Sequence, residues 1–375
     1  MHYIEVESAI AFATIAQPPS GLCHYAFQGI DFNTQPTAIQ CTYDDCIFMG
    51  CKLPDAMHHN ISPNCIILPH IDAPYKVFPA TLYTAQTLYD GYNPSQDTTF
   101  EQCYDTRVYR HYMAYGRGVT DIKESLCRTL HDHSISDALH DILSHYDERN
   151  VIAVMGGHSL LRTDTTYTQI ARIARTLTEQ GRLMISGGGP GAMEATHLGA
   201  YMAFRPDSDL TDAIKILSSA PSYKDRNWLS TAFEVIQRYS RVQEGNDIGI
   251  PTWFYGHEPA TPFATHIAKY FDNSIREDGL LAIAKGGVIF APGSAGTMQE
   301  VFQDAAQNHY KTFGYASPMI FLDREYWFNK MPVYPLLQEL MKKERYKNLL
   351  LSTADNIEEV TTALDNFLSE TTQNC

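Results

Sequence analysis

The spacing of apolar residues changes near residue 146 and divides the chain into two regions. In the first region, 1–145, apolar and polar residues alternate in short pieces, with turn residues about every ten positions. This pattern predicts short strands that stack into a small solenoid-like unit, over residues 25–32, 39–43, 46–53 and 65–68. Helices are expected at 81–88 and within the amphipathic segment 121–146. The pattern indicates no function for this region.

In the second region, 146–375, apolar runs of strand length alternate with segments of helical periodicity. The predicted strands are 151–155, 183–185, 248–255, 287–291, 318–322 and 349–352. The predicted helices are 165–180, 191–203, 262–285, 297–309, 335–343 and 356–368, with a mostly helical stretch over 210–246. This alternation predicts an α/β fold with a doubly wound parallel sheet, in which ligands bind beyond the carboxyl ends of the strands. We therefore expect two domains, 1–145 and 146–375.

A glycine-rich turn joins one of these strands to the next helix, in the sequence Ile185-Ser-Gly-Gly-Gly-Pro-Gly-Ala-Met-Glu194. Backbone N–H groups at a helix start face outward at the positive end of the helix dipole, which favours a bound phosphate. Glycine lets the backbone approach such a ligand closely. A single turn of this kind is also compatible with a tight connection that binds nothing. A second turn follows the same plan, Phe290-Ala-Pro-Gly-Ser-Ala-Gly-Thr-Met-Gln-Glu300, and the pair indicates a nucleotide.

Both motifs carry a family resemblance. Residues 186–193 resemble the glycine-rich motif of the LOG (Lonely Guy) family, often labelled lysine decarboxylase, and 292–300 resemble its P-G-G-x-G-T-x-x-E motif. The resemblance covers about 151–368. It implies a Rossmann-like homodimer that hydrolyses nucleoside 5′-monophosphates to free base and ribose 5-phosphate, without cofactor or metal. The sequence departs from the family pattern at Ser294, which replaces a glycine, and at 205–262, which is longer than in compact members.

The resemblance, together with the chemistry of the reaction, assigns roles to individual residues. Glu300 is expected to be catalytic, because a carboxylate near C1′ stabilises the oxocarbenium ion or orients water. Arg276, where the family has its arginine, is expected to contact the phosphate, hold the carboxylate or assist the departing base. If these residues have no catalytic role, Glu300 is a carboxylate that complements the helix dipole. Arg276 then forms a surface ion pair with Glu277 or Asp278.

The remaining candidates surround the two turns. The residues expected to cradle phosphate are Gly293, Ser294, Gly296 and Thr297. Those expected to line the nucleotide are Gly188, Gly189, Gly191 and Met193. Possible further contacts are Gly157, His158 and Glu194, although a loop histidine and a first-turn carboxylate also have ordinary structural roles. The aromatic run at 253–255 has two interpretations. Trp253, Phe254 and Tyr255 offer a stacking face for the ligand or, as we favour, form part of the core.

Composition limits the partners and the compartment. The net charge of −15 disfavours nucleic acid or an anionic membrane as a partner. No run spans a bilayer and no basic segment opens the chain, so we expect a cytoplasmic protein. Its eight cysteines are then expected to be reduced, mostly buried thiols. A zinc site of Cys41, Cys46, Cys51 and His58 is the alternative, although the spacing fits no standard zinc pattern.

Two other functions fit parts of the pattern. A protein that carries or senses a nucleotide or nucleotide-derived cofactor would need the same glycine turns, but neither Glu300 nor Arg276. A dinucleotide-dependent oxidoreductase would need the G-x-G-x-x-G spacing and an acidic residue for the ribose, and both turns lack this fingerprint.

Overall fold

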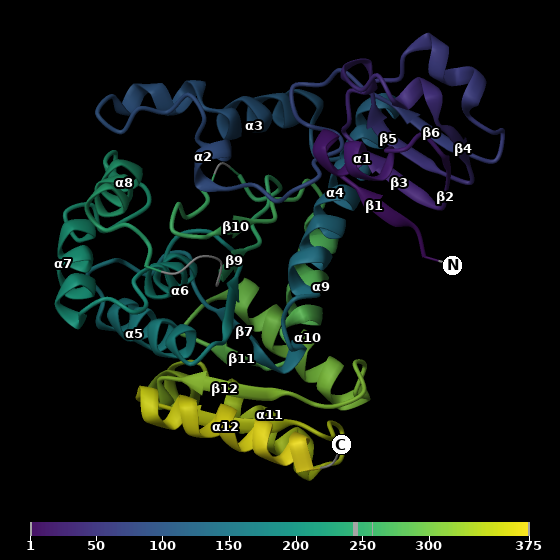
Figure 1. The fold of residues 1–375 in the computed structure, drawn as a ribbon. Helices are drawn as coiled ribbons and strands as arrows, with labels where there is room; N and C mark the ends of the chain where they lie inside the picture. Colours follow the sequence, from purple (N-terminus) through teal and green to yellow (C-terminus); the bar gives the residue numbers. More distant parts are fainter. Residues whose placement is uncertain (1, 243–246, 257, 374–375) are drawn as a thin grey trace. The chain divides into compact units, whose positions relative to one another are not determined.

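The computed structural model describes residues 2–242, 247–256 and 258–373 (Figure 1). The chain forms two compact units. The first contains the residues up to 82 together with 111–140, and the second contains 83–110 and the residues from 141 onward. Segment 83–110 thus groups with the second unit, whereas the sequence pattern alone placed it with the first region.

The first unit is built from short parallel strands. Four of them form one sheet in the order β1 (Ile4–Val6), β3 (Tyr25–Gln28), β5 (Ile47–Cys51) and β6 (Ile66–Pro69), and β2 (Gly21–Cys23) pairs with β4 (Thr42–Asp44). The pairs Ile4–Tyr25, Ala26–Ile47 and Gly21–Thr42 each join residues 21 positions apart. One coil of the chain therefore returns to the same position after 21 residues, which gives the stacked arrangement that the alternation predicts.

Helices and a core of aromatic rings complete the first unit. The helices are α1 (Ala9–Ile15) and α4 (Ile122–Leu143), of which residues 122–140 belong to this unit. Phe12, Phe27, Phe32 and Phe48 are buried and contact one another edge to face or stacked. Burial of these rings contributes to stability well beyond what strands of three to five residues supply.

The second unit contains a seven-stranded parallel sheet. Its strands run in the order β10 (His266–Ile267), β9 (Asp247–Gly249), β8 (Leu183–Ser186), β7 (Val151–Met155), β11 (Gly287–Phe290), β12 (Pro318–Leu322) and β13 (Leu350–Ala354). The chain starts at central β7, moves outward to β10, and returns to β11 on the other side of β7. This reversal confirms the predicted doubly wound, Rossmann-like α/β fold.

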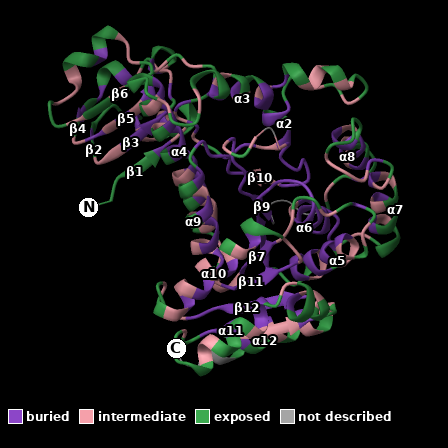
Figure 2. Cartoon of the chain, turned by 180° about the vertical axis from the view of Figure 1, so that it is seen from behind, coloured by how far each residue is buried: buried purple, intermediate pink, exposed green. Residues whose placement is uncertain are grey.

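Helices cover both faces of this sheet, with α5 and α6 on one side of β7 and α9 and α10 on the other (Figure 1). The helices that follow β7 are α5 (Thr165–Glu179), α6 (Ala192–Tyr201), α7 (Asp207–Leu217), α8 (Trp228–Arg238), α9 (Asn273–Ile283), α10 (Ala295–Tyr310), α11 (Val333–Lys342) and α12 (Ile357–Gln373). Two helices come earlier, α2 (Ala85–Leu88) and α3 (Tyr104–Tyr115), and residues 104–110 of α3 belong to this unit. The central strands are buried along their whole length (Figure 2), as their unbroken apolar runs predict.

Two element predictions in this unit are wrong. The strand expected at 248–255 ends at Gly249, because Pro251 has no N–H to donate to a neighbouring strand; only Thr252 forms a further bridge, to Tyr270. The helix expected at 262–285 begins only at Asn273, and residues 266–267 form β10 instead. Phe263, Ile267 and Phe271 are all buried, so their helix-like spacing reflects a segment covered on every side.

No helix among the described residues is long and apolar enough to cross a bilayer. Cysteines 23, 41, 46, 51, 65, 103 and 127 are free thiols, and five of these seven are buried. Cys41, Cys46, Cys51 and His58 do not form a metal-binding cluster in the described part of the chain.

Candidate functional site

Three turns meet at the carboxyl ends of the central strands of the second unit. They follow β7, β8 and β11, and strand order reverses between β7 and β11. A parallel sheet opens at such a reversal, because the two connections leave toward opposite faces. Both glycine motifs therefore lie where a ligand of this fold is expected.

Gly157, directly after β7, connects the two motifs. Its N–H donates to the carbonyl of Pro292 at 3.1 Å, and its carbonyl accepts from the N–H of Ala192 at 3.2 Å. The position of a Cβ on Gly293 would lie 3.1 Å from the Gly157 nitrogen. The predicted contact residue Gly157 thus holds the start of α6 and the turn before α10 close together.

The turn after β8 is packed on every side. Gly188, Gly189 and Gly191 are all buried, and Gly188 and Gly191 have φ of +68° and +69°. A Cβ on Gly188 would approach the Pro251 ring to 2.8 Å and the Ile250 nitrogen to 2.9 Å. The Gly188 carbonyl accepts from the N–H of Thr261 at 2.8 Å. In this structure, neighbouring protein atoms rather than solvent surround these three predicted nucleotide-lining glycines.

The turn after β11 is open. Ser294, Ala295 and Gly296 are exposed, and a Cβ on Gly296 would meet nothing within 4 Å. Ser294 occupies the N-cap position of α10 but makes no side-chain capping hydrogen bond, so the first N–H groups of this helix lack a side-chain cap. The Thr297 side chain lies directly over Gly293 and is 4% exposed. The four predicted phosphate residues are therefore adjacent, and three of them leave backbone accessible.

Glu300 lies on the second turn of α10, half-buried, beyond the first turn in which a carboxylate would complement the helix dipole. Burial raises the pKa of Glu300 to about 7; the charge of Arg276 acts to lower it, and the Glu277 carboxylate acts to raise it. A carboxyl group that titrates near neutrality is suited to exchange protons with a substrate or water.

Arg276, on α9, reaches the packed turn. Its Nε donates to the Ile250 carbonyl at 2.8 Å, and its Nη2 lies against Gly187. Its neighbours on α9 have other partners: the Glu277 carboxylate accepts from Asn273 at 2.8 Å, and Asp278 accepts from Gln303 at 2.6 Å. The guanidinium thus connects the turn after β8 electrostatically to Glu300 on α10.

Glu194 has a structural role in this arrangement. It is fully buried, and Arg162 binds it with two hydrogen bonds, Nη2 to Oε1 at 2.6 Å and Nε to Oε2 at 2.8 Å. Tyr167 donates to the same carboxylate at 3.0 Å. Because these three donors engage both oxygens inside the core, Glu194 does not face a ribose in this structure.

The other candidates lie at the edge of the site or in the core. Met193 is half-buried and covers the packed turn, its Sδ lying 2.7 Å from the position of a Gly187 Cβ. His158 is exposed and meets Tyr223 edge to face at 5.8 Å. Trp253 is fully buried, and its Nε1 donates to Asp105 at 2.8 Å, which agrees with the core interpretation for this residue. Phe254 is half-buried and Tyr255 is exposed, so the core interpretation is wrong for Tyr255.

Two residues near the site were missed from the sequence. Tyr326 donates its hydroxyl to the Gly293 carbonyl and so supports the open turn from 33 residues away. Asp304, one turn beyond Glu300, is 3% exposed; burial raises its pKa to about 8, and its Oδ2 has no hydrogen-bond partner. Asp304 is four residues after Glu300, and this spacing could have placed it on the same helix face from the sequence alone. No pattern in the neighbouring sequence identifies Tyr326.

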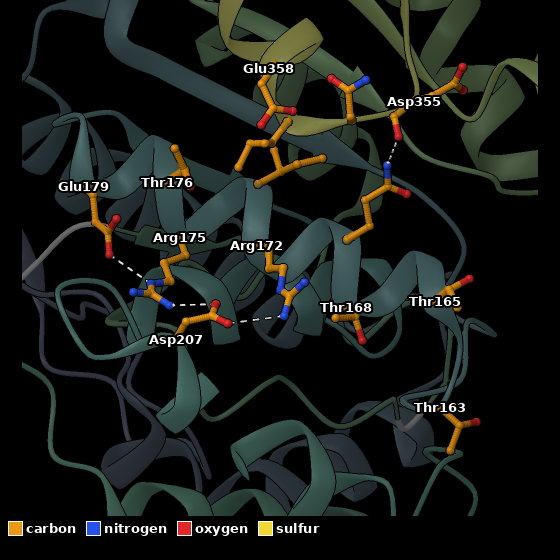
Figure 3. Close-up of a pocket in the computed structure, with 14 residues that line it drawn as sticks. Thr163, Thr165, Thr168, Arg172, Arg175, Thr176, Glu179, Asp207, Asp355 and Glu358 are labelled. Carbon is orange, nitrogen blue, oxygen red and sulfur yellow. Dashed lines mark hydrogen bonds and ion pairs between the residues drawn. The ribbon is translucent and has the colours of Figure 1, made fainter. Parts of the chain in front are cut away.

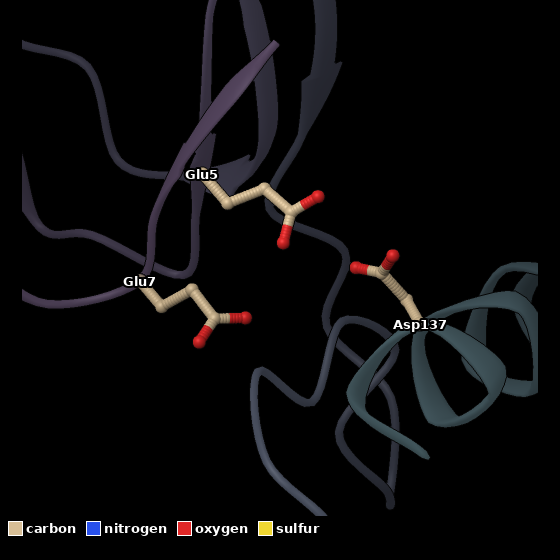
Figure 4. Close-up of side chains that lie close together, drawn as sticks. All are labelled: Glu5, Glu7 and Asp137. Atoms are coloured by element: carbon tan, nitrogen blue, oxygen red, sulfur yellow. The ribbon is translucent and has the colours of Figure 1, made fainter. Parts of the chain in front are cut away.

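Two other features resemble sites but lack the chemistry of one. In the first unit, Glu5, Glu7 and Asp137 bring carboxylate oxygens within 4.8 Å of one another (Figure 4), yet Glu5 is exposed and the other two are half-exposed. In the second unit, a surface pocket of about 780 Å³ follows α5 and the starts of α7 and α12 (Figure 3). Its two arginines already pair with Asp207, Arg172 at 3.4 Å and Arg175 at 3.2 Å, which leaves little positive charge for a phosphate.

No family model and no curated protein matches the chain. Among solved structures, a structural genomics target named TM1055 is 18% identical over 58% of this chain and 98% of its own, with a TM-score of 0.38. The molybdenum cofactor binding protein of the phototrophic bacterium Rippkaea orientalis is 16% identical over 58% and 96%, with a TM-score of 0.36. The Moco carrier protein of Chlamydomonas reinhardtii is 14% identical over 59% and 98%, with a TM-score of 0.35. At these identities and scores the likeness assigns no family, and the fold rests on the order of this chain's own strands.

Proposed function

We propose that the second unit hydrolyses the N-glycosidic bond of a nucleoside 5′-monophosphate, releasing free base and ribose 5-phosphate. The observation that carries the proposal is the position of Glu300. A carboxyl group with a pKa of about 7 lies on the same helix whose start is open and uncapped. Helix geometry places its Cα about 7.5 Å along the axis from Ala295, a separation on the scale of one ribose phosphate.

The open turn supplies the phosphate site of this proposal. Backbone N–H groups from 293–297, at the positive end of α10, would donate to the phosphate oxygens, and the Thr297 hydroxyl would add a further donor. Exposure of Ser294 and Gly296 leaves room for the ligand. The fixed positive end of the helix would offset the protein's overall charge of −15 locally.

The chemistry assigns complementary tasks to the two charged residues. As the C1′–N bond breaks, its electron pair leaves with the base, and positive charge develops on the ribose. The Glu300 carboxylate stabilises that charge and takes a proton from the attacking water, whose oxygen bonds to C1′. That proton then passes to the departing base nitrogen. Water and the monophosphate together therefore give the free base and ribose 5-phosphate. Arg276 acts to lower the pKa of Glu300 and so favours its ionised form. Its guanidinium lies against Gly187 in the turn after β8, from where it would orient the substrate.

The proposal includes no cofactor, and its substrate is a small molecule rather than a nucleic acid or a membrane. The assembly that it implies, from the family resemblance, is at least a homodimer in the cytoplasm. Light scattering of the purified chain tests the assembly, since a particle of 42.2 kDa at working concentration would be a monomer.

Incubation of the full-length protein with a panel of nucleoside monophosphates, with released base measured by chromatography, tests the activity. Release of base from at least one monophosphate, and from no free nucleoside, is the expected result. Tight binding of a monophosphate without release of any base would favour the carrier alternative instead.

A further inference from the structure

A chain of three buried side chains lies beneath the packed turn. The Ser186 hydroxyl at the end of β8 lies 2.8 Å from Nε2 of His197 on α6, and His197 Nδ1 lies 2.7 Å from Oδ2 of Asp247 on β9. All three residues are fully buried. The Ser186 oxygen also accepts the N–H of Gly188 at 3.1 Å, so the chain ends on the glycine turn itself.

The charge of Asp247 sets the direction of its hydrogen bond with His197. Burial alone would raise the pKa of Asp247, but the charge of Arg241 and the hydrogen bonds from His197 and Thr265 hold it below its ordinary value. The ionised carboxylate can only accept, so His197 donates from Nδ1. His197 Nε2 then faces the Ser186 hydroxyl, whose oxygen keeps a lone pair for the Gly188 N–H.

These residue types are those of a serine hydrolase, but the burial argues against a nucleophile. Ser186 has no exposed surface, and its hydroxyl is already hydrogen-bonded to His197 and to the Gly188 N–H. A substrate carbonyl has no access to it.

We propose that Ser186, His197 and Asp247 form a positioning relay, a chain of hydrogen bonds that holds the glycine turn after β8 in place. Because Arg276 lies against this turn, the relay also holds Arg276 in its position for the reaction. Gly188 is held on both sides, by Ser186 at its N–H and by Thr261 at its carbonyl, and it has a φ of +68°. The Arg276 guanidinium lies against the adjoining Gly187, so a shift of the turn moves the arginine that acts on Glu300. This inference rests on the proposed function for its catalytic consequence, but the hold on the turn can be measured without turnover.

The test is Ser186→Ala in the full-length protein, which removes one hydroxyl and no other atom of the relay. Hydrogen exchange of peptides covering 186–191 should become about tenfold faster, the factor expected for losing one buried hydrogen bond. The relay also predicts a kcat about tenfold lower with AMP, while the affinity for AMP, which depends on the open turn, changes less than threefold. Ser186→Cys, which keeps a weak donor and acceptor, should give values between those of Ser186→Ala and the wild type.

Thr178→Val is the matched control, because it also removes a buried hydroxyl, bonded to the Ala174 carbonyl at 2.8 Å, but lies on α5 away from the turn. It should leave both exchange at 186–191 and kcat unchanged. Unchanged exchange in Ser186→Ala would overturn the relay. Accelerated exchange in a protein whose wild type releases no base would support the hold on the turn and reject the proposed hydrolysis instead.

Discussion

The two glycine-rich turns follow the same plan of strand, turn and helix, yet the structure uses them differently. The turn after β8 is buried, with Gly188 pressed against Ile250 and Pro251, whereas the turn after β11 is exposed, with open space beside Gly296. Neither helix start has a side-chain cap. The difference teaches that a glycine motif alone does not identify a phosphate site. Neighbouring protein atoms require glycine at Gly188 in the first turn and at Gly293 in the second, whereas Gly296 has open space beside it.

The largest expected effect separates catalysis from binding at the open turn. Glu300→Gln keeps the size of the side chain but removes the charge that would face the oxocarbenium ion, so kcat should fall about 100-fold or more, roughly 3 kcal/mol of transition-state stabilisation. The affinity for AMP should stay within about threefold of the wild type, which calorimetry can measure. Gln299→Ala, at an exposed position of the same helix, is the control and should leave kcat unchanged. Release of base by Glu300→Gln at the wild-type rate would remove Glu300 from the mechanism.

The second prediction compares the two turns directly through stability. Gly188→Ala introduces a Cβ at φ +68° against Pro251 and the Ile250 nitrogen, and should lower the free energy of unfolding by about 2–4 kcal/mol. Gly296→Ala meets open space at a helix start and should be neutral or stabilise by up to about 1 kcal/mol. Chemical denaturation of both variants decides the point. Equal destabilisation by the two substitutions would show that the turns are packed alike.

The third prediction concerns binding by the open turn. Although Gly296→Ala should not harm the fold, its methyl group would occupy space needed by a phosphate, so the affinity for AMP should fall about tenfold, or 1.4 kcal/mol. Gly279→Ala is the matched control, because a Cβ there also meets nothing within 4 Å but lies in α9 away from the turn. Loss of affinity in both variants, or in neither, would argue against a phosphate at the start of α10.

The smallest predicted effect is a shift in pH dependence. Because Glu300 acts as the carboxylate, kcat/KM should rise as pH increases through about 7, the pKa of this group in the free protein. Glu277→Gln removes a charge that raises this pKa, so the midpoint should move to lower pH, by less than about one unit. Asp278→Asn removes the neighbouring exposed charge and should leave the midpoint in place. A midpoint that responds equally to both substitutions would mean that Glu300 is not the titrating group.

The centre of the sheet could be predicted from the sequence because β7, β11 and β12 are short apolar runs. The runs at 151–155 and 318–322 match β7 and β12 residue for residue, and the predicted helix at 297–309 lies within α10. The relation of Glu300 to the helix start follows from helix geometry, so the sequence placed both on the same element correctly.

The remaining features depend on contacts between residues far apart in the chain. The partner of Glu194 is Arg162, 32 residues earlier, and no local pattern marks the pair. The packing of Gly188 is set by Ile250 and Pro251, which the sequence pattern assigned to one continuous strand. Sequence spacing therefore identified which residues belong to the turns, but only the folded chain shows which turn is open.

The measurement that tests the central claim most directly is calorimetric titration of the wild-type protein with AMP and with adenosine. Both ligands have the same base and ribose, so their difference isolates the 5′-phosphate at the start of α10. We predict that AMP binds more tightly by about 2–4 kcal/mol, as several charge-assisted hydrogen bonds to backbone N–H groups would give. Equal affinity for AMP and adenosine would contradict the assignment of the open turn as a phosphate site.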